Sequence, residues 1–562
     1  MTDVETNADA LIKTLKDCGI DHVLANAGTD TAPIIESLAK LADSNEKYPR
    51  FLVTPHENLA MAMAHGYYRR SAKPAAVLLH TTVGSANGVM GAMNALRDQV
   101  PIIMLAGRTP NTESGQLGSR SAHIHWGQET FDQASMLREW LKWDYEARTG
   151  QPMATLVRRA IAIAKSQPPG PIYLTLPREV LAGPSTEPQY ANETDVTAPA
   201  MPNLIAIEKV AHQLMRAQLP LIVTSSGGRS REAFRALSDL ATRFAIPIAQ
   251  PFATDANVPS NHDMNFGFEG MSLVKEADLI LVIEAGVPWV GDVTPNADAT
   301  VVQIAADPQY TAYPLRGFKT DMALSGDIAL VIAALQASLP QDLEVGRRRK
   351  LLTELQTKRR QRIDQAIKAS AKQTPISAIW LADCLNRVKN DLVEENVVVI
   401  NELGVPPDYL DLSQPRSYMR ESTAGGLGFG LGAALGNKLA DRDAYVIAVV
   451  GDGSYMLGNP TPAHFMAHAY DLPTLTIINN NQRWQAVHNA TSAMYPDGHA
   501  TRGRTMPLTR LTPSPAYEKV VEASDGYGEK VIKPKDLIGA LERGIEMVDA
   551  GKPAVINVLT AA

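Results

Sequence analysis

The sequence predicts an α/β protein of three consecutive α/β domains with mainly parallel sheets. Short apolar runs alternate with longer segments of helical periodicity along the 562 residues, and this alternation is typical of parallel sheets. Two stretches interrupt the pattern: a Pro- and Thr-rich one at 183–203 and a basic one at 347–372. The predicted domains are therefore residues 1–182, 204–340 and 373–562, each long enough for its own core.

The first domain begins with an amphipathic helix at Ala8–Cys18. Its predicted strands are the short apolar runs His22–Ala25, Ala75–Leu79, Ile102–Ala106 and Ile172–Leu176. Residues 183–203 lack periodicity and are predicted to be a linker.

The second domain has predicted strands near Leu221–Thr224, Leu279–Ile283 and Val301–Ile304. The turn Ser226-Gly227-Gly228 follows the first of them. A nucleotide such as FAD is possible there but not indicated, because glycines after a strand are more often simple turns. The basic stretch 347–372 contains Glu354 and Asp364, so a solvated linker helix is favoured over a nucleic-acid contact.

Composition excludes several classes of function. The net charge of −7 argues against broad nucleic-acid binding, and no apolar stretch approaches the ~20 residues of a membrane span. The two cysteines, Cys18 and Cys384, have no metal-ligand spacing. The N-terminus is polar and acidic without an apolar segment. We expect a cytoplasmic protein.

Polar side chains follow two neighbouring predicted strands of the third domain. The apolar run Tyr445–Val450 ends in Gly451-Asp452-Gly453-Ser454, and the run Leu472–Ile478 ends in Asn479-Asn480-Asn481. Parallel strands would bring this carboxylate and these amides to one sheet edge, where α/β proteins bind ligands. Oxygen ligands with few charges suit Mg²⁺, and a helix N-terminus there favours a diphosphate.

These residues carry a resemblance to a known family. Gly451-Asp452-Gly453-Ser454 with Asn480-Asn481 resembles the thiamine diphosphate (ThDP) signature of the acetolactate synthase, benzoylformate decarboxylase and pyruvate decarboxylase family. The resemblance runs over nearly the whole chain. It implies that the three domains are pyrimidine-binding, central and diphosphate-binding. It also implies a homodimer or homotetramer with active sites between subunits.

The resemblance assigns the metal and diphosphate ligands residue by residue. Asp452, the Asn481 side chain and the Arg483 backbone carbonyl would bind Mg²⁺, with Asn481 a better match than Asn480. Gly451, Gly453 and Ser454 would complete the cofactor-binding loop. The segment Leu457–Pro460 is about two residues longer than usual for the family.

Glu57 opens a predicted alanine-rich helix in Thr54-Pro55-His56-Glu57-Asn58. The family uses a glutamate here to hydrogen-bond the aminopyrimidine ring, which stabilises the imino tautomer that removes the thiazolium proton. The alternative is a first-turn acid that faces the helix dipole. His56 and His65 lack the spacing of a zinc pair.

A glycine-rich segment, Thr423–Gly430, precedes another predicted helix. Gly428-x-Gly430-x-x-Ala433 matches the dinucleotide fingerprint by letter, but that fingerprint must follow a strand, and Met419–Thr423 is polar and unlike a strand. The resemblance instead makes Leu427 the residue that wedges beneath the cofactor, and the Gly425 carbonyl an acceptor for its amino group. Glycines allow this close approach.

His80 follows a predicted strand, in a segment much like that of benzoylformate decarboxylase, which uses a histidine here in proton transfer. Asn26–Asp30 also resembles that enzyme, and Thr29 takes the place of its hydroxyl that binds the substrate carboxylate; Ala27 departs from the usual proline. A buried, structurally satisfied histidine is the alternative. The resemblance also places several polar and aromatic residues where they could face the substrate, and exposed surface positions are an equal alternative. These residues are Gln116, His123, His125, Trp126, Trp484 and His488.

Together these features predict a ThDP- and Mg²⁺-dependent enzyme acting on a small 2-oxo acid or related carbonyl substrate. The favoured function is a benzoylformate decarboxylase-like reaction, in which an enamine is protonated or ligated to a carbonyl. An acetolactate synthase-like carboligase is the first alternative, and a 2-hydroxyacyl lyase or diketone hydrolase the next. A non-catalytic binding protein with the same fold is the alternative from another class.

Overall fold

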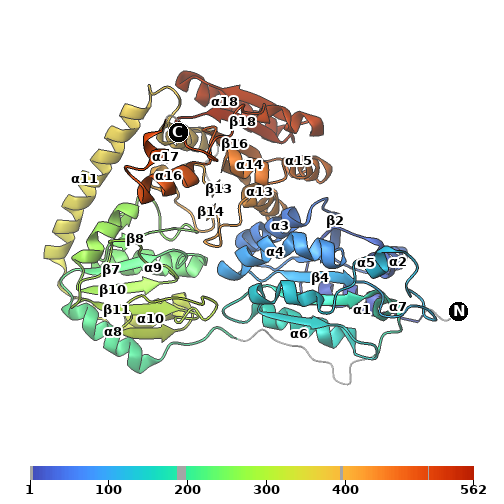
Figure 1. The fold of residues 1–562 in the computed structure, drawn as a ribbon. Coiled ribbons are helices and arrows are strands. Elements are labelled where there is room, and N and C mark those ends of the chain that lie inside the picture. The colour runs from blue at the N-terminus through green and yellow to red at the C-terminus, as the bar shows by residue number, and fades with distance from the viewer. Residues whose placement is uncertain (1–3, 187–197, 393–395, 504) are drawn as a thin grey trace. The chain divides into compact units, whose positions relative to one another are not determined.

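The computed structural model describes residues 4–186, 198–392, 396–503 and 505–562. These residues form three six-stranded sheets, and all paired strands in them are parallel. The predicted α/β class with three parallel-sheet domains is confirmed (Figure 1). Most of the predicted linker 183–203 falls on 187–197, outside the described residues, as do the first three residues of the predicted polar N-terminus.

The first sheet follows the prediction closely in its central strands. In spatial order its strands are β2 (Arg50–Val53), β1 (His22–Ala25), β3 (Ala76–Leu79), β4 (Ile103–Arg108), β6 (Ile172–Pro177) and β5 (Trp143–Glu146). Its helices are α1 (Asn7–Asp17), α2 (Ala32–Asp43), α3 (Glu57–Ser71), α4 (Thr81–Arg97), α5 (Ile124–Gly127), α6 (Met153–Lys165) and α7 (Arg178–Ala182). Thr6 and Asp9 form a reciprocal capping box that starts α1. Leu11, Ile12 and Leu15 then pack into the core under the sheet.

The central sheet has the strand order of dinucleotide-binding folds. In space its strands are β12 (Met322–Ser325), β11 (Thr300–Ala305), β10 (Leu279–Ile283), β7 (Pro220–Thr224), β8 (Ile248–Ala249) and β9 (Asn265–Gly267), with helices α8 (Leu204–Arg216), α9 (Arg231–Phe244) and α10 (Ile328–Ala337). Gly228 follows β7, at the point where the strand order reverses. A Cβ on Gly228 would lie 2.3 Å from the Asn257 carbonyl oxygen. This glycine therefore admits the chain's own Asn257 loop.

The basic stretch forms the predicted helix, α11 (Gly346–Ser370). It is less solvated than expected. The Arg348 guanidinium donates to the carbonyls of Ala217 and Phe244, and the Arg359 side chain is buried beside Asp408. These bonds tie α11 to neighbouring elements.

The third sheet carries the predicted metal motif. In space its strands are β14 (Tyr418–Arg420), β13 (Val397–Glu402), β15 (Tyr445–Gly451), β16 (Leu475–Asn480), β18 (Ala554–Leu559) and β17 (Tyr527–Val531). Its helices are α12 (Ala378–Leu392), α13 (Phe429–Ala440), α14 (Asp452–Leu457), α15 (Pro460–Ala469), α16 (Gln485–Met494), α17 (His499–Arg502) and α18 (Leu537–Asp549).

One local expectation for this domain was wrong. The polar segment Met419–Thr423 is not free of strand, because Met419 and Arg420 end edge strand β14 beside β13. Strand β16 ends in amide side chains, as the sequence predicts, because Asn479 and Asn480 are its last two residues. Their amide nitrogens bond to the Gly404 carbonyl and the Asn557 side chain, which makes polar residues compatible with a buried strand.

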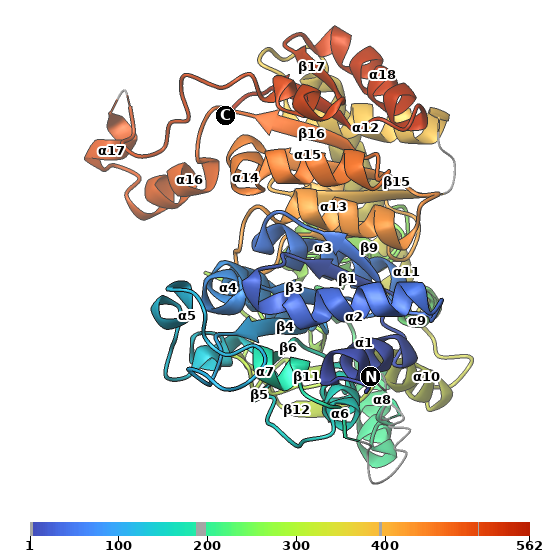
Figure 2. The same ribbon diagram turned by 90° about the vertical axis from the view of Figure 1, so that its right-hand side faces the viewer.

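The chain divides into two compact units, which do not follow the sequence order. Unit 1 comprises 1–197, 421–443 and 456–473, and unit 2 comprises 198–420, 444–455 and 474–562. Unit 1 thus includes α13 and α15 from the last third of the chain. In both views α13 lies along α3 (Figure 2). In the described parts of the chain, no helix has the length and apolar character of a bilayer-spanning segment.

Candidate functional site

Unit 2 contains the predicted metal ligands. Gly451 ends β15, pairs with Asn479 of β16, and is followed at once by Asp452, the first residue of α14. The Asp452 side chain is buried; its Oδ1 accepts a hydrogen bond from the Gly453 N–H at 3.0 Å, while its Oδ2 has no hydrogen-bond partner. Burial raises the pKa of the Asp452 carboxyl to about 6, which the N–H groups of Gly453 and Gln482 only partly offset. An unpartnered buried carboxylate oxygen is costly unless a cation compensates it.

The segment after β16 approaches this carboxylate. Asn481 is half-buried, and its Oδ1 accepts from the Arg483 N–H at 3.0 Å. The Leu511 N–H donates to the Gln482 carbonyl, and the Trp484 N–H donates to the Thr509 carbonyl. Neither of these two bonds uses the Arg483 carbonyl. Asn479 and Asn480 use their amide nitrogens inside the sheet, so Asn481 is the asparagine of the run that lies beyond the strand. This arrangement favours Asn481 over Asn480 as a ligand.

Gly453 allows Trp484 to lie directly over the loop. A Cβ on Gly453 would lie 2.2 Å from the Trp484 ring, so this position requires glycine. Ser454 is buried one residue later. Among the described residues, no group of three or more His, Cys, Asp or Glu side chains forms a metal cluster. A cation at Asp452 would therefore be held by one carboxylate together with amide, carbonyl or phosphate oxygens, which is a donor set that suits Mg²⁺.

Unit 1 contains the predicted pyrimidine-side residues. Glu57 is the first residue of α3, 7% exposed, and its Oε2 accepts a hydrogen bond from the Asn87 amide of α4 at 3.1 Å. A Cβ on Gly84 would lie 3.1 Å from the Glu57 Oε1, so the first turn of α4 passes close to this carboxylate. The predicted alanine-rich helix is confirmed, and it begins at Glu57.

His80 caps the same helix α4, at the end of β3. The next residue, Thr81, has φ +40°, which is unusual for a β-branched residue and signals local backbone strain. His80 Nδ1 makes a short hydrogen bond to Asp30 Oδ1, and the Gln128 amide nitrogen lies 3.3 Å from its Nε2. The bond to Asp30 raises the pKa of His80.

Sequence reasoning missed Asp30. It lies in the quoted segment Asn26–Asp30, directly after Thr29. Thr29 itself is exposed, and its carbonyl accepts from Arg178. The available signal was an acid beside the predicted hydroxyl, but nothing local linked that acid to a histidine fifty positions away.

The glycine-rich segment Thr423–Gly430 also belongs to unit 1. Gly426 exchanges two hydrogen bonds with the Asn94 side chain of α4, at 2.9 and 3.2 Å. Gly425 has φ +72° and open space at its Cβ position, and Leu427 is half-buried. The Gly425–Leu427 segment is therefore held against the helix that supplies His80 and Asn87.

Helices α3 and α13 pack closely through small residues. A Cβ on Gly432 would lie 3.0 Å from the Leu59 carbonyl oxygen, and one on Gly436 would lie 2.0 Å from the Met63 carbonyl oxygen. Phe429, the first residue of α13, lies against the His65 ring of α3. The Gly425–Leu427 segment therefore leads into α13 beside the middle of α3, whereas Glu57 lies at the start of α3.

The weaker candidates divide. His125 is a structural residue: its Nδ1 accepts from the backbone of Ser121 and Ala122, and burial lowers its pKa. Trp126 is 51% exposed, with the Arg120 guanidinium on its ring. Trp484 covers Gly453, as described above. Gln116 and His123 are exposed loop residues, and His488 lies on α16.

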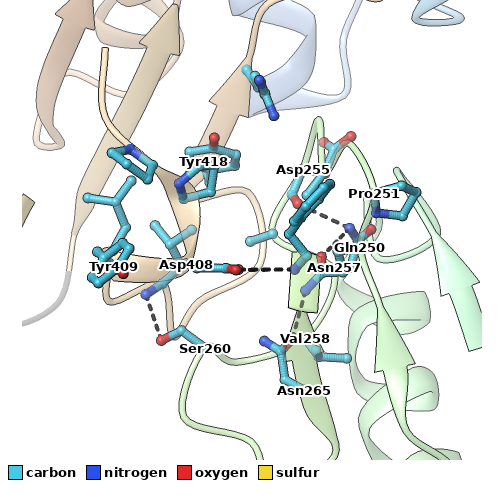
Figure 3. Close-up of a pocket in the computed structure, with 18 of the residues that line it drawn as sticks. Gln250, Pro251, Asp255, Asn257, Val258, Ser260, Asn265, Asp408, Tyr409 and Tyr418 are labelled. Carbon is cyan, nitrogen blue, oxygen red and sulfur yellow. Dashed lines mark hydrogen bonds between the residues drawn. The ribbon is translucent and has the colours of Figure 1, made fainter. Parts of the chain in front are cut away.

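Unit 2 also has a pocket of about 250 Å³ that none of the predicted site residues lines. It lies between residues 250–260 and the segment 406–420; Asp408 and Tyr409 form one wall, and Asp255 and Asn257 the other (Figure 3). Several of its polar groups are bonded to other residues that line it. Asp408 accepts from the Phe268 N–H at 3.2 Å, and Asn257 donates to the Gln250 side chain at 2.8 Å.

Comparison with known proteins identifies the family. Models of the thiamine pyrophosphate enzyme N-terminal, central and C-terminal domains match residues 5–136, 207–335 and 406–558. The chain is 28% identical to benzoylformate decarboxylase of Pseudomonas aeruginosa (86% of this chain, 87% of that protein) and 22% identical to the acetolactate synthase large subunit of Buchnera aphidicola (99% and 95%). The crystal structure of benzoylformate decarboxylase from Polynucleobacter necessarius has the same fold, with a TM-score of 0.80 and 20% identity over 99% of both chains. The chain belongs to the thiamine pyrophosphate-dependent enzyme family.

Proposed function

We propose that the protein is a ThDP- and Mg²⁺-dependent decarboxylase of a small 2-oxo acid. The observation that carries this proposal is the buried Asp452 carboxylate, whose Oδ2 has no partner within the described residues. Asp452, the Asn481 side chain and the Arg483 carbonyl would hold the cation, and Gly451, Gly453 and Ser454 would line the diphosphate. When bound, ThDP supplies an electron sink for the charge left by departing carbon dioxide.

The residues of unit 1 have distinct tasks in this proposal. Glu57, held by Asn87, would hydrogen-bond the pyrimidine ring and keep a proton at its ring nitrogen. The Gly425 carbonyl would accept from the amino group, and Leu427 would support the bent cofactor. Thr29 would bind the substrate carboxylate, and His80 would carry a proton to or from the reacting carbon. In the family, such sites form between subunits, so we also propose a homodimer or homotetramer.

Product analysis tests the proposal. The purified protein, supplied with ThDP and Mg²⁺, is given benzoylformate or pyruvate, and carbon dioxide, aldehyde and acyloin are followed. Carbon dioxide with a stoichiometric aldehyde is the expected result. Protein that binds ThDP yet turns over neither substrate nor other 2-oxo acids would contradict a decarboxylase and favour the lyase, hydrolase or non-catalytic alternatives.

A carboligase similar to acetolactate synthase is the second candidate. It is favoured by the near-complete coverage of the Buchnera relative, which exceeds that of the Pseudomonas benzoylformate decarboxylase. Acyloin or acetolactate as the main product from pyruvate would select this alternative.

A further inference from the structure

The buried Asp30 and the half-buried His80 form a hydrogen-bonded pair that the family resemblance did not assign. Asp30 lies on the short 3-10 helix η1 (Thr29–Thr31) after β1, and His80 lies after β3. Strands β1 and β3 are neighbours, so the turns at their carboxyl ends meet at one edge of the sheet. The pair joins these two turns through the hydrogen bond between Asp30 Oδ1 and His80 Nδ1.

Two glycines make room for the pair. A Cβ on Gly28 would lie 2.0 Å from His80 Nδ1, and a Cβ on Gly107 of β4 would lie 1.3 Å from Asp30 Oδ2. Any side chain at either position would displace one member. The pair therefore requires glycine at both position 28 and position 107.

The two members differ in their access to solvent. The Asp30 side chain is 3% exposed and that of His80 is 19% exposed. Nδ1 is bonded to Asp30, which leaves Nε2 as the ring nitrogen on the side of Gln128. Since the Gln128 amide offers both an oxygen and an N–H, it can face either the protonated or the neutral ring.

The charged groups acting on the ring are both acidic. Asp30 acts from η1 and Glu57 from α3, and each stabilises the protonated imidazole, whereas burial opposes it. The residue contributed by the segment after α5, Gln128, is neutral. An imidazolium held by a carboxylate on its far nitrogen is a proton donor oriented at Nε2.

We propose that Asp30 is a positioning residue, which fixes the Nδ1–H form of His80 and stabilises its imidazolium, so that His80 Nε2 delivers the proton that completes decarboxylation. The inference rests on the proposed function. The bond between the substrate carboxylate and the carbonyl carbon breaks, carbon dioxide leaves, and the electron pair remains with that carbon. One proton from Nε2 forms the new C–H bond. His80 is then neutral, keeps its bond to Asp30, and regains a proton from water.

A chemical titration tests the pair without cofactor or activity. Diethyl pyrocarbonate acylates neutral imidazole, so the pH at half-maximal modification of a histidine reports its pKa. The tryptic peptide 71–97 contains His80 as its sole histidine, since the Lys73–Pro74 bond resists trypsin. We expect the His80 midpoint in the Asp30→Asn variant to fall by at least about one pH unit, the scale for loss of a neighbouring opposite charge. The exposed His212, in peptide 210–216, should not change. Equal His80 midpoints in the two proteins would overturn the pair.

Kinetics test the role of the pair. With ThDP and Mg²⁺, Asp30→Asn should lower kcat about 10- to 100-fold, leave KM within a few-fold, and move the basic limb of the kcat–pH profile to lower pH. Asp43→Asn, a change at the exposed end of α2, is the matched control. If the two residues act as a unit, Asp30→Asn should cost little more in a His80→Gln background. An unshifted basic limb would overturn the positioning role.

The two experiments separate the inference from the proposed function. A shifted modification midpoint in a protein that decarboxylates no 2-oxo acid would leave the pair intact and refute the function. If the wild type decarboxylates a 2-oxo acid, but Asp30→Asn has the same His80 modification midpoint and the same kcat–pH profile, the function would stand and the role of the pair would be refuted. Unchanged thermal unfolding of the variant excludes simple misfolding.

Discussion

The buried carboxylates of the two units differ in their hydrogen-bond partners. In unit 1, side chains supply the partners: Asn87 of α4 donates to Glu57, and His80 bonds to Asp30, whose Oδ2 has no further partner among the described residues. In unit 2, Asp452 is buried with one oxygen unpartnered, and its pKa is raised to about 6. Side-chain networks rigidify a site, while a buried carboxylate bonded only to backbone N–H groups favours a bound cation. This difference fits the proposed function, in which unit 1 supplies the proton-transfer residues and unit 2 the cation ligands.

The largest effect is expected from Asp452→Ala. Removing the only carboxylate among the three predicted cation ligands should abolish ThDP binding in calorimetry with Mg²⁺ and lower turnover at least about a thousandfold, given several kcal/mol from the metal. The cofactor-free protein should be no less stable than the wild type, because a buried unpartnered group is lost. Unchanged ThDP affinity would contradict the contrast between the units.

Glu57→Gln should have the next largest effect, with a different signature. The amide keeps the size and the contact with α4 but loses the acid. Turnover should fall about a hundredfold or more, the usual scale for an acid–base partner, while folding and ThDP affinity stay close to those of the wild type. The measurement is kcat beside calorimetry on the same preparation. Near-normal turnover would remove Glu57 from the proton relay.

Gly107→Ala, a change on β4, should disrupt the contact between Asp30 and His80 in unit 1. The new Cβ would overlap Asp30 Oδ2, and overpacking of this kind costs about 1–3 kcal/mol. We expect a lower free energy of unfolding, together with a lowered modification midpoint at His80. Gly127→Ala is the matched control, since its Cβ position is open and surface changes stay within about 0.5 kcal/mol. Equal stability of the two variants would show that Asp30 is not confined by β4.

The parts of the fold that were predicted from sequence are those with local signals. Strands β1 and β15 are unbroken apolar runs, and the first helix has clear periodicity and a capping residue, so their bounds agree with the structure within a residue or two. Edge strands β2, β5 and β14 were not predicted. Each is short and carries charged residues, such as Arg50, Glu146 and Arg420, because one side of an edge strand pairs with nothing.

The residues of the candidate site also fall into those with local sequence signals and those that depend on distant contacts. Glu57, His80 and Asp452 were singled out because each follows a strand or starts a helix in a segment that resembles the family, and both signals are local. Asp30 was missed, because its role depends on the pairing of β1 with β3 and on glycines at Gly28 and Gly107, which only the folded chain brings together. The participation of Asn479 and Asn480 in β16 likewise depends on distant partners, Gly404 and Asn557.

The smallest effect concerns acid stability and sharpens the contrast between the units. His464 on α15 in unit 1 is buried, and burial lowers its pKa to about 4 from 6.5. Between these values the unfolded chain binds more protons than the folded one, so stability is retained above pH 6.5 and lost as pH falls towards 4. From this shift, His464 alone should lower the free energy of unfolding at pH 5 by on the order of 2 kcal/mol. His464→Gln should therefore narrow the difference between thermal unfolding temperatures at pH 7 and pH 5 by a few degrees, whereas His212→Gln, at an exposed position, should not. An equal pH difference in all three proteins would mean that acid does not act on unit 1 through this histidine.

The raised pKa of Asp452 has the opposite effect on stability, since a proton on that carboxyl favours the folded form as pH falls. Hydrogen exchange at the two pH values should therefore show α15 losing more protection in acid than α14 does.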